Sequence, residues 1–161
     1  MIIVKKNFEL DVKDIIDNFK ITVDIGQNDS YYNQYKQQLI TLNEDIVTKM
    51  CDVVKGELGD IEISVEYTRV NLVEEDSNKN DPYHTDMGYD LIFTYYPNDD
   101  YEGGEFVWYE NSMVYEIKPT KNMLTIMLDN PKHKVRNVTS GKRYSIVTFC
   151  KIKRNIVKTL L

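Results

Sequence analysis

The stretch IEISVEYTRVNLV, from Ile61 to Val73, has a period of two that runs along most of its length. This period is typical of a β-strand with one buried face. The pattern predicts that six side chains share the inward face of the strand, namely Ile61, Ile63, Val65, Tyr67, Arg69 and Asn71. Because the period of two begins directly after Gly59, we expect the β-structured part of the chain to start here.

Six further strand-like runs follow, and clusters of turn residues separate them. They are DLIFTYY (90–96), GEFVWYE (104–110), SMVYEIK (112–118), NMLTIML (122–128), HKVRNV (133–138) and RYSIVTFCKIKR (143–154). Many short strands at this spacing predict a β-sandwich or a jelly roll.

The chain upstream of residue 60 has a helical character. We expect a short strand, IIVK (2–5), then a helix over residues 11–19 that begins at Asp11, a polar loop, GQNDSYYN (26–33), and a longer helix that ends at Gly59. Thr41 and Glu44 fit a capping box for the longer helix. Its apolar stripe is predicted to comprise Leu39, Leu42, Ile46, Met50 and Val53.

These patterns predict an α+β protein that is mainly β and forms one domain over residues 1–161. Residues 1–59 would be a helical support and residues 60–155 the β core. Of the 161 residues 42% are hydrophobic, which is enough for a single core.

Cys51 and Cys150 are the only cysteines, too few for a disulfide scaffold or a thiolate metal cluster. The first ten residues become charged too early for a secretory signal, and no apolar run approaches the roughly 20 residues of a membrane span. We therefore expect a soluble, cytoplasmic or otherwise intracellular protein with reduced thiols and no membrane partner.

The net charge is −6, yet residues 130–161 include nine basic residues and no acidic one. Pairing of basic with acidic strands across a sheet explains this most simply, and a basic wall in a pocket for an anion is the alternative. The acidic molecule has no basic-aromatic stripe, which weighs against nucleic acid as a partner without excluding it.

The stretch DPYHTDMGYD (81–90) contains His84 and Asp86, one residue apart. On a strand such residues project from the same face, so both can reach one metal ion. His133 is the only other histidine, several predicted strands later. Two imidazoles and one carboxylate on one side of an ion form the facial triad of non-haem Fe(II) oxygenases. Alone, a His-x-Asp pair arises easily by chance, and a lone histidine is more often a packed or surface residue than a ligand.

Arg143 follows His133 by ten residues, with Ser140 and Gly141 between them. This spacing predicts a hairpin that sets the Arg143 strand against the His133 strand. Ser145 should share the face of Arg143. Arginine gives a planar, bidentate grip on a carboxylate, and a serine hydroxyl can add a donor.

In this order the segments resemble the Fe(II)- and 2-oxoglutarate-dependent dioxygenases, most of all the prolyl 4-hydroxylase-like branch. The family pattern is His-x-Asp, Tyr-Leu-Asn, Gly-Gly-Glu, His and Gly-x-Arg. The matching segments are HTD (84–86), YYPNDDYEGGEFVWY (95–109), HKV (133–135) and GKRYSIVTF (141–149). The resemblance covers roughly residues 61–152 and implies a double-stranded β-helix (jelly-roll) core with the N-terminal helices packed on one sheet.

The resemblance also implies roles for individual residues. Fe(II) would be held by His84, Asp86 and His133, and Arg143 would pair with the C5 carboxylate of 2-oxoglutarate. Ser145 and Tyr96 are candidates for further contacts with that carboxylate. Many relatives have a second cosubstrate contact, a tyrosine some ten residues before the first histidine, which this chain lacks. Tyr67 and Asn71 are the candidates to replace it. Tyr96 fits an ordinary strand tyrosine equally well, and Tyr67 fits a core residue better. The implied cofactors are Fe(II), the cosubstrate 2-oxoglutarate and O₂, with ascorbate as an additional candidate.

The implied reaction is hydroxylation of a substrate with release of succinate and CO₂. A peptidyl proline is the first candidate, because this branch modifies prolyl residues, and a free amino acid, another small molecule or a nucleobase are the alternatives. The polar loop EEDSNKNDPY (74–83) is a candidate lid or a plain connector. A jelly roll that binds a metal or ligand without turnover is the alternative of another class.

Overall fold

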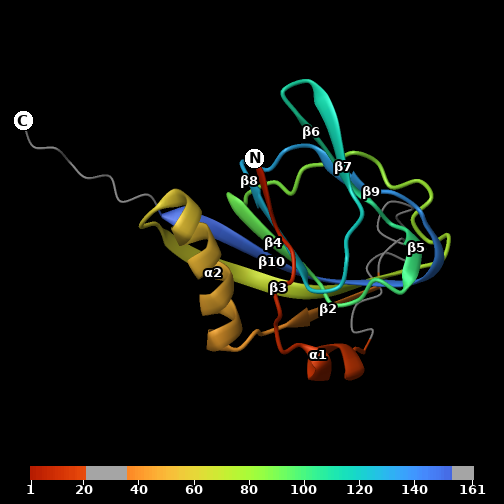
Figure 1. Ribbon diagram of the computed structural model, residues 1–161, viewed down its shortest axis with the longest axis horizontal. Helices are drawn as coiled ribbons and strands as arrows, with labels where there is room; N and C mark the ends of the chain where they lie inside the picture. Colours follow the sequence, from red (N-terminus) through yellow and green to blue (C-terminus); the bar gives the residue numbers. More distant parts are fainter. Residues whose placement is uncertain (21–35, 154–161) are drawn as a thin grey trace, which may run out of the picture.

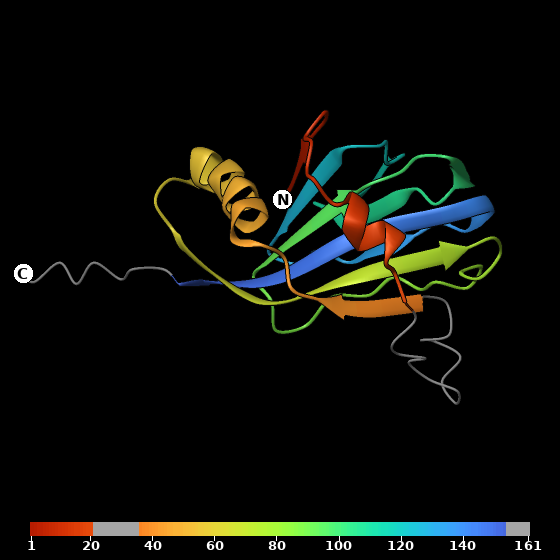
Figure 2. The same ribbon diagram turned by 90° about the horizontal axis from the view of Figure 1, so that it is seen from below.

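A computed structural model describes residues 1–20 and 36–153, which form two antiparallel sheets and two helices (Figures 1 and 2). The larger sheet comprises β1 (Ile2–Lys5), β2 (Lys36–Ile40), β3 (Glu62–Glu74), β4 (Leu91–Tyr96), β5 (Tyr101–Gly103), β8 (Met123–Leu128) and β10 (Val138–Lys153). The smaller sheet comprises β6 (Phe106–Glu110), β7 (Met113–Ile117) and β9 (His133–Val135). The helices are α1 (Lys13–Asp17) and α2 (Glu44–Leu58).

The strands of the larger sheet lie in the order β1-β8-β4-β10-β3-β2, and β5 pairs with the start of β10. The smaller sheet has the order β7-β6-β9. Figure 1 shows the helices on one side of β3 and β10 and the smaller sheet on the other. This arrangement confirms the predicted jelly-roll core with helices packed on one sheet.

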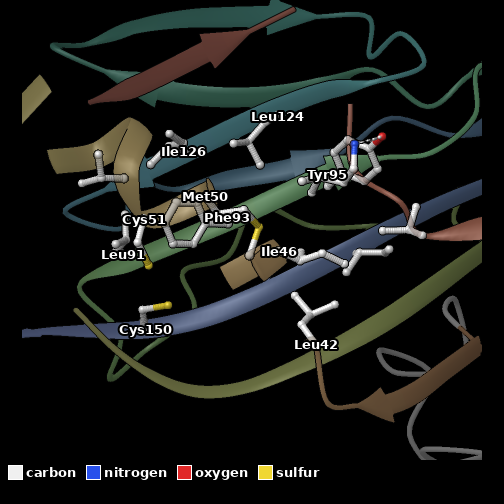
Figure 3. Close-up of a cluster of buried hydrophobic side chains, with 14 of the residues drawn as sticks. Leu42, Ile46, Met50, Cys51, Leu91, Phe93, Tyr95, Leu124, Ile126 and Cys150 are labelled. Atoms are coloured by element: carbon white, nitrogen blue, oxygen red, sulfur yellow. Dashed lines mark hydrogen bonds between the residues drawn. The ribbon is translucent and has the colours of Figure 1, made fainter. Parts of the chain in front are cut away.

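One face of the larger sheet packs against α2, which covers it with Ile46, Met50, Cys51 and Val54. Figure 3 shows Ile46, Met50 and Cys51 next to Leu91 and Phe93 of β4. The sheet contributes more residues to this cluster, among them Val70, Tyr95, Leu124, Ile126, Leu128, Ile146 and Cys150.

The opposite face of the larger sheet packs against the smaller sheet. Ile92, Met127, Val147 and Phe149 of the larger sheet meet Phe106 and Trp108 of β6 in a second cluster. Both faces of β4 and β8 are therefore covered, which explains why the runs DLIFTYY and NMLTIML are apolar almost throughout.

A β-bulge in β3 corrects the expectation that six of its side chains share one face. Phe149 of β10 is opposite Tyr67, whereas Cys150 is opposite Val65, so Glu66 is the extra residue. Ile61 and Ile63 therefore pack on the helix side, while Tyr67 belongs to the cluster between the sheets, and Arg69 and Asn71 line a cavity there.

The predicted hairpin between His133 and Arg143 is wrong. His133 begins β9, which pairs with β6, whereas Arg143 lies in β10, between β3 and β4. Ser140 and Gly141 are strand residues opposite β5. Serine and glycine are common in turns, but a long strand that bends past the edge of a sheet can also contain them, and the hairpin prediction failed for this reason.

The helix starts also differ from the prediction. The cap of α2 is Asn43, whose side chain accepts the Ile46 N–H at 2.9 Å, and the cap position of α1 is Val12. Residues 36–40 form an edge strand and are not part of the helix. Leu39, which was predicted to belong to the apolar stripe of the helix, lies in this strand and is 63% exposed. Gly59 does end α2, with φ of +83°. The expected loop 26–33 and the chain beyond 153 lie outside the described residues.

Three of the seven described basic residues after Asn130 pair with acidic side chains, as the simpler explanation predicts. The pairs are Lys142 with Glu74, Lys153 with Glu62 and Arg136 with Glu116. Arg143 differs from them, because it is buried and lines the cavity.

Candidate metal centre and cosubstrate cavity

His84, Asp86 and His133 come together at one edge of the smaller sheet. Their ligand atoms all lie within 4.8 Å of one another, and the His133 Nε2 atom is 3.3 Å from Asp86 Oδ2. Backbone hydrogen bonds of 2.9 Å in both directions between His84 and His133 hold the two imidazoles side by side. The predicted triad thus forms a compact group of the type that coordinates a divalent transition metal.

The histidine side chains are oriented by backbone carbonyls. Nδ1 of His84 is 3.1 Å from the Pro82 carbonyl oxygen, and Nδ1 of His133 is 2.8 Å from that of Pro131. A carbonyl oxygen only accepts hydrogen bonds, so each Nδ1 carries the proton, and Nε2 is the nitrogen whose lone pair suits a metal ion. Metal-binding histidines usually have this second contact, and the site therefore fits a metal.

Asn130 holds the loop that contains Asp86. Its Oδ1 accepts the Asp86 N–H at 2.9 Å, and its Nδ2 donates to the Asp86 carbonyl oxygen. Burial favours the neutral form of Asp86, but the hydrogen bond and charge of His133, with smaller contributions from His84 and Arg69, hold the pKa of this carboxyl below its ordinary value. Asp86 is therefore a carboxylate at neutral pH.

Arg143 lies on the larger sheet and faces the same cavity. It is 2% exposed, its Nε donates to the Gly104 carbonyl oxygen at 3.1 Å, and its guanidinium lies 5.1 Å from the centre of the Tyr96 ring. Among the described residues no acidic side chain forms an ion pair with it. A buried guanidinium without a carboxylate partner fits an anionic ligand such as 2-oxoglutarate.

Gly104 makes room for Arg143. A Cβ atom on this glycine would lie 2.8 Å from Arg143 Cδ, and its φ of +70° is one that other residues rarely adopt. The pair Gly103 and Gly104, both with positive φ, therefore shapes the turn, and Gly104 also leaves the space that the arginine side chain occupies.

The other predicted cosubstrate contacts divide into two groups. Ser145 and Asn71 are opposite each other on β10 and β3 and both line the cavity, as does Tyr96. The Tyr96 hydroxyl and Asn71 Oδ1 are buried without a hydrogen-bond partner among the described residues. Tyr67 instead stacks on Phe149, with ring centres 4.5 Å apart, so Asn71 is the better placed of the two candidates.

The cavity between the sheets has a volume of about 440 Å³, which is sufficient for small ligands. It contains all the predicted site residues except Tyr67. It also contains Arg69, which the strand pattern placed on the inward face without assigning it a role. The roles of Arg69 and Asn130 depend on what surrounds them, and no spacing in the sequence could have indicated this.

The candidate lid is fastened to the protein. Asn78 is 1% exposed, its Nδ2 donates to the carbonyl oxygens of Val135 and Arg136, and its Oδ1 accepts the Val138 N–H. The Asp81 carboxylate accepts the Val135 N–H at 2.8 Å. These buried contacts support the connector interpretation of residues 74–83.

A comparison with protein-family profiles matches residues 71–151 to the 2OG-Fe(II) oxygenase superfamily. The chain belongs to this superfamily. It is therefore an Fe(II)- and 2-oxoglutarate-dependent dioxygenase, and O₂ is its second cosubstrate. With iron and 2-oxoglutarate bound, such a site supplies O₂ activation coupled to the loss of CO₂ and the formation of succinate. A comparison with curated proteins finds no match.

Solved structures with the same fold include three with different substrates or ligands. The viral collagen prolyl hydroxylase of Paramecium Bursaria Chlorella virus-1, in complex with 2OG, has a TM-score of 0.66 and 15% identity, over 92% of this chain and 94% of the other. A Trichoplax adhaerens prolyl hydroxylase, bound to a hypoxia inducible factor peptide fragment, has values of 0.68 and 17%, over 93% and 83%. Streptomyces hygroscopicus HygX, with nickel, 2-oxoglutarate and hygromycin B, has values of 0.68 and 9%, over 93% and 82%.

At these identities the likeness shows a common fold. None of the described helices is long and apolar enough to cross a membrane.

Proposed function

We propose that His84, Asp86 and His133 hold Fe(II) and that Arg143 binds the C5 carboxylate of 2-oxoglutarate, so that a substrate in the same cavity is hydroxylated. The observation that carries this proposal is the placement of a compact His-Asp-His group and a buried arginine without an acidic partner in one cavity. The two parts match the two ends of a 2-oxo dicarboxylate.

In this proposal the chain contributes binding, orientation and shielding from water. Arg143 fixes the far end of the cosubstrate, and Ser145, Tyr96 and Asn71 add polar contacts beside it. The aromatic and aliphatic residues between the sheets exclude water from the reacting atoms. We further propose that residues 1–161 act as one domain with its core at 60–155, inside the cell, where the buried Cys51 and Cys150 stay unpaired.

We propose two candidate classes of substrate. A peptidyl proline is supported by the fold shared with two prolyl hydroxylases, one of them bound to a peptide. A small molecule is supported by the fold shared with HygX, which is bound to hygromycin B. Which of these substrates fits the cavity depends on the side chains that line it.

A binding experiment without oxygen tests the proposed site. Fe(II) and 2-oxoglutarate added to the folded protein should produce the visible charge-transfer band of the chelate. Arg143→Met should keep the iron but weaken 2-oxoglutarate by about 10- to 100-fold, because a charge-assisted bond to a carboxylate is lost. Arg136→Met, at an exposed arginine paired with Glu116, is the control and should change neither.

Asp86→Asn should abolish the band, and Asp52→Asn on the exposed side of α2 should not. Absence of the band in the folded wild-type protein would contradict the proposed site. A band without any succinate release in air, with every candidate substrate, would favour the binding protein without turnover.

A further inference from the structure

Arg69 is a second arginine in the cavity, separate from the one proposed to bind the cosubstrate. It lies in β3 opposite Val147 of β10, whereas Arg143 is opposite Val73. Val147 lies four positions after Arg143 on β10, so the two arginines start roughly 13 Å apart along the strands. Arg69 lines the same cavity as His84, Asp86 and His133.

The guanidinium of Arg69 is held but not neutralised. It lies over the Phe149 ring, 4.8 Å from the ring centre, and Tyr67 stacks on the same ring. Among residues 1–20 and 36–153, its buried Nε has no hydrogen-bond partner and no acidic side chain forms an ion pair with it. Stacking on an aromatic ring fixes the guanidinium plane and leaves its edge available for bonds within that plane.

The acidic side chains of the cavity have other contacts. Asp86 contacts His133, and Asp81 accepts the backbone N–H of Val135. Among the described residues that line the cavity, Arg69 and Arg143 are the only arginines, and there is no lysine. No carboxylate of the described residues forms an ion pair with this half-buried cation, so it suits an anionic ligand, and a planar monoanion matches a single guanidinium in both charge and shape.

We propose that Arg69 binds a carboxylate of the substrate that is hydroxylated, so that this protein acts on small molecules with a free carboxylate, of which a free amino acid is the simplest. The proposal rests on the proposed function, because Arg143 is then committed to 2-oxoglutarate. An internal peptidyl proline has no charge to offer Arg69, which separates the two substrate candidates.

The test uses the full chain loaded with Fe(II) and 2-oxoglutarate without oxygen. The common L-amino acids and short-chain carboxylates from acetate to valerate are titrated, each beside its neutral amide. A blocked, proline-containing peptide amide represents the peptide candidate. Binding is read from the change in the visible band and from the heat of mixing, so no turnover is needed.

At least one free acid should bind, and its amide should bind about tenfold more weakly or worse. Arg69→Met should weaken that acid by a similar factor while 2-oxoglutarate affinity stays within about twofold, and Arg69→Lys should restore part of the loss. Arg136→Met is the matched control and should bind the acid like the wild type.

Three results would overturn the proposal. The first is that acid and amide bind equally well, or that no free acid binds at all. The second is that the peptide amide binds more tightly than every acid. The third is that Arg69→Met also loses affinity for 2-oxoglutarate, which would make Arg69 a cosubstrate residue. Failure of the proposed function is a separate outcome, because the wild-type protein would then show no band before any acid is added. The comparison of acid with amide needs no variant, so it holds even if Arg69→Met does not fold.

Discussion

Asn130 grips the backbone of Asp86 from both sides, with its amide oxygen on the N–H and its amide nitrogen on the carbonyl oxygen. The carboxylate proposed as a metal ligand is thus positioned by a residue 44 places further along the chain, just before the strand that begins with His133.

Asn130→Ala should therefore loosen the proposed metal site. Loss of both contacts leaves the Asp86 loop free to move, and we expect Fe(II) affinity to fall by roughly 10- to 100-fold, as for other groups that orient metal ligands. Isothermal titration with Mn(II) or Fe(II) measures the effect. Asn111→Ala, at an exposed turn between β6 and β7, is the control, and an unchanged affinity in Asn130→Ala would show that Asp86 needs no such support.

Gly104→Ala should damage cosubstrate binding. The added Cβ would lie 2.8 Å from Arg143 Cδ, so the guanidinium must shift, and the positive φ adds a backbone cost of about 1–2 kcal/mol. Gly59→Ala is the matched control, since its φ is also positive but no atom lies within 4 Å of the new Cβ. Both variants should lose stability in urea unfolding, and only Gly104→Ala should weaken 2-oxoglutarate. Equal 2-oxoglutarate affinity in the two variants would refute the steric argument.

The folded protein should lose stability at alkaline pH. Burial raises the pKa of Cys150 from 9.0, and that of Tyr101 from 10.0, to about 12 in each case, although the charge of Arg143 acts in the opposite direction on Tyr101. The unfolded chain therefore releases these protons first, and stability present below pH 9 is lost as the pH rises from about 9 towards 12.

Each such group should lower the unfolding free energy by up to about 1.4 kcal/mol per pH unit within this window. Urea unfolding between pH 8 and 11 measures the slope. Cys150→Ala should flatten the slope, even though the variant is less stable at pH 8 because a cavity is left. An unchanged slope would show that the thiol ionises as easily in the folded protein as in the unfolded chain.

Phe93→Ala should be among the most destabilising substitutions on the helix side of the larger sheet. Phe93 is fully buried in the cluster beneath α2, and truncation of such a side chain costs about 3–5 kcal/mol. Val114→Ala on β7, where the valine is 50% exposed, should stay within about 0.5 kcal/mol. Urea denaturation of the two variants tests this difference, which vanishes if α2 repacks over the cavity.

Local patterns were sufficient to predict most of the fold. The runs that became β4, β6, β7 and β8 are contiguous in sequence and bounded by turn residues, and Pro97 ends β4 directly after Tyr96, as a residue without an N–H should. The bulge at Glu66 could not be predicted, because the alternation of side chains in the sequence continues through it without a break. The partner of β9 was also missed, because which strands pair is decided by packing across the whole domain.

The candidate site shows a similar division. His84, Asp86, His133 and Arg143 were found because their residue types and order are unusual together. Arg69 was placed on the correct face, but its interest lies in the absence of an acidic partner nearby, which only the folded chain reveals. Asn130 looks like an ordinary turn residue in sequence, and its contacts with Asp86 exist only after β8 and β9 have brought them together.

Only two residues separate β9 from β10, yet these strands belong to different sheets. The proposed metal ligand His133 is therefore carried by the smaller sheet and Arg143 by the larger one. A dicarboxylate held at both ends would be a non-covalent crosslink between the two halves of the sandwich. Once the crosslink forms, hydrogen–deuterium exchange of the backbone amides should then slow down in both sheets, in β6 and β9 as well as in β4 and β10. The cosubstrate would thus be a structural component of the enzyme as well as a reactant.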